Sequence, residues 1–234
     1  MRKILLIVTQ LLFALSLSAQ TQQELRDSVS MISKLIEEHP RAVKLRLRKA
    51  ALNIALDQWQ YALDEYTNVL EMMPSNLTAL YYRGYVNQHM KRYNFARQDY
   101  EALLKYEPSN EHALMGLILT NLADSHTTEA YDGANRLVTM FPESPSSYSV
   151  RADVEQGLGM VDAAIDDLEK AIALESPCVG STLTIDDDMA SYQLSVCELY
   201  LSKGEKSKAR KSLDYLVQRG IAKASLYDYY VRAK

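Results

Sequence analysis

The stretch PSNLTALYYRGYVNQHMKRYNFARQDYEALLKYEPSN, from Pro74 to Asn110, begins and ends with the same three residues. Its two PSN prolines are 34 residues apart, and Pro40 and Pro142 continue the same interval on either side. A fixed period of this size indicates a protein built from stacked structural repeats. Because proline cannot continue a helix, each of these prolines also predicts the end of one repeat and the turn into the next.

Each 34-residue repeat contains two apolar patterns with helical spacing. A small residue at position 8 and a large aromatic residue at position 24 recur in the first two full repeats, as Ala50 with Tyr66 and Gly84 with Tyr100. In this combination the sequence resembles the tetratricopeptide repeat (TPR) family. The resemblance implies an all-α fold, a right-handed α-solenoid (superhelix) of stacked antiparallel helix pairs. The small residues would then lie where the two helices of a repeat cross closely.

The repeat pattern divides the chain into segments. We expect a signal peptide at 1–19, a half-repeat at 20–42, four tandem repeats within 43–178 (43–76, 77–110, 111–144 and 145–178), an inserted loop at 179–189, a divergent fifth repeat at 190–223 and a capping helix at 224–234. Caps are expected because a stacked helix pair has an apolar face that it cannot bury alone. Ile118 stands at a position 8 that is small elsewhere, which predicts looser packing in the third repeat.

A base at position 7 is accompanied by an acid at position 23 in three repeats, as Lys49 with Glu65, Arg83 with Asp99, and Arg151 with Asp167. The third and fifth repeats have apolar Leu117 and Val196 at the first position, and uncharged Gly133 and Ser212 at the second. Base and acid therefore occur together or not at all. We interpret them as ion pairs between the two helices of one repeat. A half-buried pair of this kind fixes helix register more than it adds stability.

In proteins of the family that the sequence resembles, positions 2, 5, 9, 12 and 13 of the first helix face a concave groove. The resemblance implies a partner-binding groove over the first three repeats, formed by Leu47, Ala51, Tyr81, Tyr85, Gln88, His89, His112, Met115 and Leu119. An apolar and aromatic patch of this kind suits an extended or helical peptide. Tyrosine is favoured there because it offers a large contact area at a low entropic cost. The alternative is that the patch packs against the inserted segment or another copy of the chain.

The first nineteen residues, MRKILLIVTQLLFALSLSA, differ from the rest of the chain. Arg2 and Lys3 precede an apolar stretch that ends at Leu17, and Ser18 and Ala19 are small, which is the layout of a secretory signal peptide. The stretch is shorter than the roughly 20 residues of a membrane span. We expect cleavage after Ala19 and no stable membrane span afterwards, and an uncleaved anchor is the alternative. The protein would then be exported, periplasmic or associated with the outer envelope of a Gram-negative bacterium.

After cleavage the chain would have 24 basic and 30 acidic side chains, a net charge of −6. It contains no run of basic residues, which argues against nucleic-acid binding. Cys178 and Cys197 are its two cysteines, and one disulfide or two free thiols are both open. We favour free thiols, because Cys197 falls at a position 8 where a small apolar side chain suits helix packing.

No pattern in the sequence indicates catalysis. The four histidines are not spaced as metal ligands on one helix, and no phosphate-binding glycine loop or paired nucleophile and base is present. The segment IDDDM at Ile185–Met189 lacks the spacing and the glycine of a calcium loop. We therefore expect a non-enzymatic protein–protein interaction scaffold or adaptor, without cofactor or metal. The alternatives are a structural or self-associating envelope component, or an accessory binder of a glycan or small molecule.

Overall fold

The computed structural model describes residues 21–175 and 187–234. A helix at residues 21–38 is followed by α2 (Val43–Ala55), α3 (Trp59–Met72), α4 (Leu77–His89), α5 (Tyr93–Tyr106), α6 (Glu111–Ala123), α7 (Thr127–Met140), α8 (Pro145–Gly157), α9 (Val161–Leu174), α10 (Asp187–Ser202), α11 (Lys206–Gln218), the 3-10 helix η1 (Lys223–Leu226) and α12 (Tyr227–Arg232). These ranges contain no β-strand. The predicted signal peptide, Cys178 and most of the predicted insertion lie outside them.

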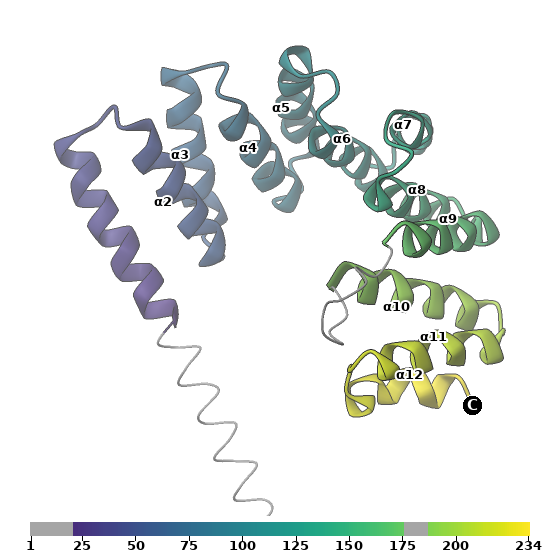
Figure 1. Cartoon of the computed structure of the whole chain (residues 1–234). Helices are drawn as coiled ribbons and strands as arrows, with labels where there is room; N and C mark the ends of the chain where they lie inside the picture. Colours follow the sequence, from purple (N-terminus) through teal and green to yellow (C-terminus); the bar gives the residue numbers. More distant parts are fainter. Residues whose placement is uncertain (1–20, 176–186) are drawn as a thin grey trace, which may run out of the picture. The chain divides into compact units, whose positions relative to one another are not determined.

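The chain divides into two compact units, which we call unit 1 (Met1–Pro108) and unit 2 (Ser109–Lys234). In unit 1, α3 packs against both α2 and α4, and α4 packs against α5 (Figure 1). In unit 2, consecutive helices from α6 to α11 pack in the same manner, and α12 packs against α11. Within each unit, the helices from α2 onward therefore contact their neighbours in sequence, as expected for stacked helix pairs.

Asparagine side chains begin α4 and α6. Oδ1 of Asn76 accepts a hydrogen bond from the backbone N–H of Ala79, and Oδ1 of Asn110 accepts one from Ala113, both at 2.9 Å. These bonds satisfy backbone donors that the first turn of a helix leaves unpaired. The recurrence of PSN now has a physical reason, because the proline ends one helix and the asparagine caps the next. Pro145, as the first residue of α8, needs no N–H there.

Every turn inside a helix pair contains a residue with positive φ. The values are 57° for Asp57, 59° for Lys91, 62° for Ser125, 74° for Gly159 and 75° for Gly204. All five residues stand at position 15 of their repeats. Glycine adopts this left-handed conformation readily, whereas other residues adopt it at an energetic cost. The turn geometry is therefore constant along the chain although its residues differ.

Position 8 lies at the crossing of the two helices, where Ala50, Ala152 and Cys197 are at most 2% exposed. Ile118 occupies this position in the third repeat and is also buried. It lies so close to Gly133 that a Cβ there would be 2.9 Å from Ile118 Cγ1. The missing side chain of Gly133 thus makes room for the larger one at the crossing itself. Over the whole repeat, α6 and α7 still pack less extensively than the two helices of any other repeat, in agreement with the predicted looser packing.

Helix α10 begins at Asp187, within the segment that the sequence assigned to the inserted loop. Met189, in its first turn, is buried. The insertion therefore ends earlier than predicted, because an apolar side chain anchors the start of the helix. Among the described residues, no helix has both the length and the apolar composition that crossing a bilayer requires.

Candidate functional site

Tyr100, a buried residue of α5, packs against α4 beside the residues that were predicted to line the groove. The two helices approach closely at Gly84, where a Cβ would lie 3.1 Å from the ring of Tyr100. Tyr81 meets that ring edge-on, with centroids 6.0 Å apart. The Tyr100 hydroxyl donates a hydrogen bond to Oε1 of Gln88 at 3.3 Å. One core residue thus orients two of the residues predicted to line the groove.

Trp59, the first residue of α3, orders the other end of the same surface. Its ring stacks on His89 with centroids 3.6 Å apart and planes 13° from parallel, and it lies 6.1 Å from the ring of Tyr85. Tyr85 is 40% exposed, His89 is also exposed, and Tyr81 is half-buried. We call the surface formed by Tyr81, Tyr85, Gln88 and His89 the α4 face.

Tyr81 on the α4 face is uncharged at neutral pH. Burial raises the pKa of Tyr81 above its usual value, and the neighbouring Tyr82 and Tyr85 raise it further. Burial likewise raises the pKa of Tyr100, which supports the face from below. The hydroxyls of Tyr81 and Tyr100 therefore stay protonated at neutral pH. The surface combines aromatic area with the hydrogen-bonding amide of Gln88.

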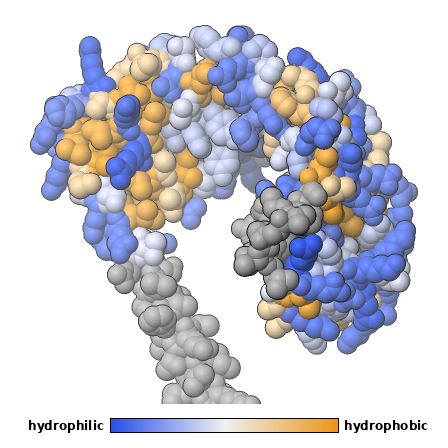
Figure 2. Space-filling model, viewed as in Figure 1, coloured by the Kyte–Doolittle hydropathy of each residue, from blue (hydrophilic) through white to orange (hydrophobic). Residues whose placement is uncertain are grey.

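The remaining predicted groove residues of unit 1 are Leu47 and Ala51 on α2, which are half-buried and exposed respectively. Figure 2 shows apolar surface over the helix at residues 21–38 and α2. Large apolar side chains exposed on the first of these helices include Met31, at 56%, and Leu35, at 37%. Sequence reasoning did not include these two residues, because the half-repeat offers no first helix on which to count groove positions.

The other three predicted groove residues lie in unit 2, on α6. His112 is exposed, whereas Met115 and Leu119 are half-buried and pack against a core that includes Ile118 and Leu137. Two of the three therefore contribute to the stability of unit 2. The residues that the structure brings together into one ordered surface are those of α4.

The structure brings together all three base–acid pairs found in the sequence, with distances of 2.9 Å for Lys49 Nζ to Glu65 Oε1, 2.6 Å for Arg83 Nη2 to Asp99 Oδ1, and 2.6 Å for Arg151 Nε to Asp167 Oδ2. Both arginines use Nε and Nη2 together, so each pair is bidentate. Each pair joins the two helices of one repeat. These six residues therefore hold the two helices of a repeat in register.

Arg46 is a second base on Glu65 that sequence reasoning missed. Its Nη1 lies 2.7 Å from Glu65 Oε2, and the same guanidinium donates to the carbonyl of Pro40. Burial works to raise the pKa of Glu65, but hydrogen bonds and charges from Lys49 and Arg46 outweigh it and hold the pKa below its usual value. The sequence did contain a signal for this contact, because Arg46 is a charged residue at position 4, where the family that the sequence resembles has a large apolar one.

Position 11 carries a buried amide in the first three repeats, at Asn53, Asn87 and Asn121. In the fourth repeat it carries Glu155, which is 4% exposed and whose Oε2 has no hydrogen-bond partner. Its Oε1 lies 3.9 Å from Nε of Arg151, which is already bound to Asp167. Burial, and then the charge of Asp167, raises the pKa of Glu155 to about 7. The recurrence of asparagine at position 11 was visible in the sequence, but the buried environment of Glu155 was not.

Solved structures show what this arrangement resembles. A tetratricopeptide repeat protein from Parabacteroides merdae ATCC 43184 matches 92% of this chain and 79% of its own, with a TM-score of 0.71 and 21% identity. A thermophilic TPR protein from Thermus thermophilus matches 82% of this chain and 98% of its own, with a TM-score of 0.65 and 21% identity. The chain has the TPR fold. The all-α solenoid expected from the sequence is thereby confirmed.

A third TPR structure matches over a similar length. YrrB, a TPR protein with an unusual peptide-binding site, matches 81% of this chain and 92% of its own, with a TM-score of 0.51 and 20% identity. No family model matches the sequence. The TPR likeness therefore rests on the fold and on the repeat pattern.

Reactive and metal-binding groups were also sought on this TPR fold. In residues 21–175 and 187–234, no three His, Cys, Asp or Glu side chains group so as to hold a metal ion. Cys197 is free and buried, and burial raises the pKa of its thiol to about 11. A protonated thiol of this kind is a weak nucleophile. Its place at a helix crossing agrees with a packing role.

Proposed function

We propose that this chain is an exported, non-enzymatic scaffold that binds a segment of a protein partner on its α4 face. The observation that carries the proposal is the fixed geometry of Tyr81 and Tyr85, of which Tyr85 is 40% exposed. Both rings lie against aromatic neighbours, Tyr100 and Trp59. A preorganised aromatic surface loses little conformational entropy when a partner binds.

Gln88 adds directional binding to the same surface. Its Oε1 accepts from the Tyr100 hydroxyl, which fixes the amide and leaves the NH₂ group to donate. A peptide backbone offers carbonyl oxygens that match such a donor. YrrB has the same fold and a peptide-binding site, which supports this class of ligand. The fold alone does not decide the role, because one fold hosts many functions.

The experiment is capture of partners from detergent-extracted cell envelope by immobilised protein that begins at Gln20. The Tyr85→Ala variant should lose a partner that the unchanged protein retains. Tyr61→Ala is the matched control, because Tyr61 is a 64% exposed tyrosine on α3, outside the α4 face. Circular dichroism should show the same helix content for all three proteins. A partner retained equally by the Tyr85→Ala variant would contradict the assignment of this face.

Export is proposed from the layout of residues 1–19, and it has a separate test. The protein would be isolated from the periplasmic fraction of its host and its N-terminal residue determined. Cleavage predicts Gln20 as the first residue. Recovery of a chain that still begins at Met1 in the membrane fraction would instead favour an uncleaved anchor.

Self-association is a second candidate, favoured by the exposed Met31 and Leu35. Exposed apolar side chains close together on one helix are typical of contact surfaces. Light scattering over a wide concentration range distinguishes the two candidates, because a scaffold for another protein stays monomeric. If the mass rises with concentration, a Leu35→Glu variant should return it to that of a monomer.

A further inference from the structure

The helix at residues 21–38 carries one stripe of exposed and half-buried side chains. The stripe consists of Glu24, Ser28, Met31, Leu35 and Glu38, which follow one another at intervals of three or four residues and therefore share one face of the helix. Its middle is apolar, with Met31 56% exposed and Leu35 37% exposed. Figure 2 shows apolar surface over this helix. We call this stripe the half-repeat face.

The same face is buried in the full repeats. Met31 and Leu35 lie one 34-residue period before Glu65 and Val69, so they stand at positions 23 and 27. The residues at position 27 of the full repeats are at most 1% exposed, namely Val69, Leu103, Leu137, Ala171 and Leu216. Those at position 23 are buried or half-buried, namely Glu65, Asp99, Gly133, Asp167 and Ser212. Large apolar side chains are thus exposed in the half-repeat at positions that the full repeats cover.

In the full repeats, the first helix of the repeat covers this face. Position 23 meets position 7 of that helix where Asp99 Oδ1 lies 2.6 Å from Arg83 Nη2. It meets position 8 where a Cβ on Gly133 would lie 2.9 Å from Ile118 Cγ1. The half-repeat has no such helix among its described residues. After the cleavage proposed above, the chain would begin at Gln20, and the covering helix would have to come from another molecule.

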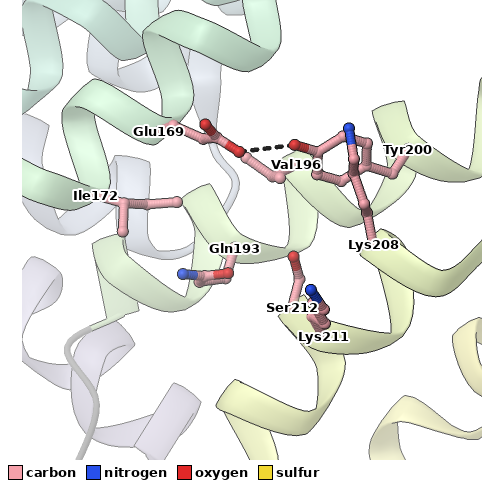
Figure 3. A pocket seen from close by; sticks show the side chains of 8 residues that line it. All are labelled: Glu169, Ile172, Gln193, Val196, Tyr200, Lys208, Lys211 and Ser212. Atoms are coloured by element: carbon pink, nitrogen blue, oxygen red, sulfur yellow. Dashed lines mark hydrogen bonds between the residues drawn. The ribbon is translucent and has the colours of Figure 1, made fainter. Parts of the chain in front are cut away.

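Position 23 also indicates the chemistry of the covering helix. In the full repeats, an acid at this position occurs with a base at position 7, and an uncharged residue occurs with an uncharged one. The fifth repeat is an example of the uncharged case, in which Val196 and Ser212 line one cavity without an ion pair between them (Figure 3). Met31 belongs to this uncharged class. The helix that covers it should therefore carry an apolar residue at position 7.

The ends of the half-repeat face are acidic. Glu24 and Glu38 are 14 residues apart, or about 21 Å along the helix, and residues 21–38 have a net charge of −2. A second copy that paired in register through this face would place glutamate opposite glutamate, in a parallel or an antiparallel arrangement, and opposed like charges are unfavourable. Its first helices α2, α4, α6, α8 and α10 are already packed against their own second helices. A different helix with basic ends suits this face better.

We propose that the half-repeat face binds an amphipathic helix of another protein, apolar along its middle and basic at both ends, which takes the place of the missing first helix. The proposal rests on the cleavage after Ala19 but makes no use of the α4 face. The bound helix carries a small residue where it crosses the half-repeat, because Ala50, Ala152 and Cys197 at the equivalent crossings are at most 2% exposed. Docking of an apolar helix face onto an apolar surface is a common mode of peptide recognition.

The test measures fluorescence anisotropy of a labelled peptide with protein that begins at Gln20. The probe has the sequence of residues 43–58, because α2 packs against a second helix in this manner within the first repeat. Two changes adapt it to the half-repeat: Lys49→Leu supplies the apolar position 7, and Asp57→Lys adds a base at its end, opposite the base of Lys44. Saturable binding is expected. A second peptide that keeps Asp57 and has Lys44→Glu should bind at least about threefold more weakly, because it reverses the charge at both ends.

Variants of the protein place the peptide on this face. Leu35→Glu should weaken binding at least about tenfold, because it puts a charge into the apolar contact. Phe95→Glu, at a 59% exposed position of α5, is the matched control and should bind as the unchanged protein does. Tyr85→Ala should also bind normally, which separates this proposal from that for the α4 face. Circular dichroism should show the same helix content for all variants.

Three outcomes would overturn the proposal. One is the absence of saturable binding to the first peptide. Another is binding that survives Leu35→Glu or is lost in Tyr85→Ala, since the peptide would then lie elsewhere. The third is a mass that doubles with protein concentration in the absence of peptide and returns to that of a monomer in Leu35→Glu, because a second copy would then cover the face.

Discussion

At the crossing of α6 and α7, the large side chain of Ile118 packs against Gly133, which has no side chain. Other repeats place a small residue at position 8 and, in three of them, an acid at position 23. Here the large side chain is at position 8, and position 23 has none. The missing ion pair of this repeat therefore has a steric reason, because an acid at Gly133 would occupy the volume of Ile118.

Replacing Gly133 with alanine should consequently lower stability, although alanine is the better helix former. The added Cβ would lie 2.9 Å from Ile118 Cγ1, and a β-branched side chain in a helix has little freedom to move away. Overpacking costs about 1–3 kcal/mol, against a helix-propensity gain of about 1 kcal/mol. Urea unfolding should show a net loss of about 1 kcal/mol in the free energy of unfolding.

The sign of this effect should reverse when Ile118 is already alanine. In that background the added methyl group meets no obstacle, and Gly133→Ala should raise the free energy of unfolding by about 1 kcal/mol. A double-mutant cycle measures the coupling between the two sites. Equal effects of Gly133→Ala in both backgrounds would show that the contact does not constrain this crossing.

Glu155 makes the stability of unit 2 depend on pH. Its pKa is raised from 4.5 to about 7, chiefly by burial. Between these values the folded chain holds a proton that the unfolded chain has released. Rising pH over this interval therefore lowers the contribution of Glu155 to stability, and the full penalty is present above about pH 7.

Glu155→Gln should remove this penalty while keeping the shape of the side chain. The variant should differ little from the unchanged protein near pH 5, and it should be more stable by on the order of 1 kcal/mol near pH 8. Urea unfolding at a series of pH values between these limits checks the prediction. Asp132→Asn, an exposed acid on α7, is the control and should show no such trend. A constant difference across the range would contradict a buried titrating carboxyl.

Among the elements, the turns inside the helix pairs are conformationally alike and chemically different. Position 15 has positive φ in all five pairs, but only Gly159 and Gly204 are residues that favour it. The left-handed conformation costs a residue with a side chain about 1–2 kcal/mol. Glycine avoids this cost, but its greater conformational entropy in the unfolded chain offsets about half of the advantage. The first three turns therefore hold strain that the last two do not.

Lys91→Gly should relieve this strain and raise the free energy of unfolding by about 0.5–1 kcal/mol. Lys91→Ala removes the same side-chain atoms beyond Cβ without relieving the backbone, and it should leave stability nearly unchanged. The midpoints of urea unfolding distinguish the two variants. If both variants stabilised the protein equally, the charge of Lys91 rather than its backbone would be responsible.

The elements also show how far sequence reasoning reaches. The 34-residue interval and the PSN motif predicted helix pairs because prolines, asparagine caps and small residues act locally or at fixed repeat positions. The ion pairs were predictable because base and acid occur together. The positive φ at position 15 was not predictable, because Asp57, Lys91 and Ser125 have chemically different side chains. The contact of Arg46 with Glu65 was missed for another reason, because it depends on which of several neighbouring side chains reaches the carboxylate.

For the whole molecule, a stacked array must terminate without exposing the apolar face of its last helix. In unit 2, Leu226, Tyr230 and Ala233 are buried in one cluster with Leu213 and Leu216 of α11, both 0% exposed. The Tyr230 hydroxyl donates to Oδ1 of Asp214 at 2.7 Å, which fixes the register of the last helix.

Deletion of residues 224–234 should therefore destabilise unit 2 and promote association of the truncated chain. The deletion exposes Leu213 and Leu216 and removes three buried side chains, which together contribute at least about 3 kcal/mol. Leu226→Ala tests the same contact within the full chain and should cost about 2–4 kcal/mol. Val231→Ala, at a 44% exposed position of α12, should cost less than about 0.5 kcal/mol. If thermal unfolding and light scattering of the truncated protein matched those of the full chain, α11 would not need this cap, and the array would end one helix earlier.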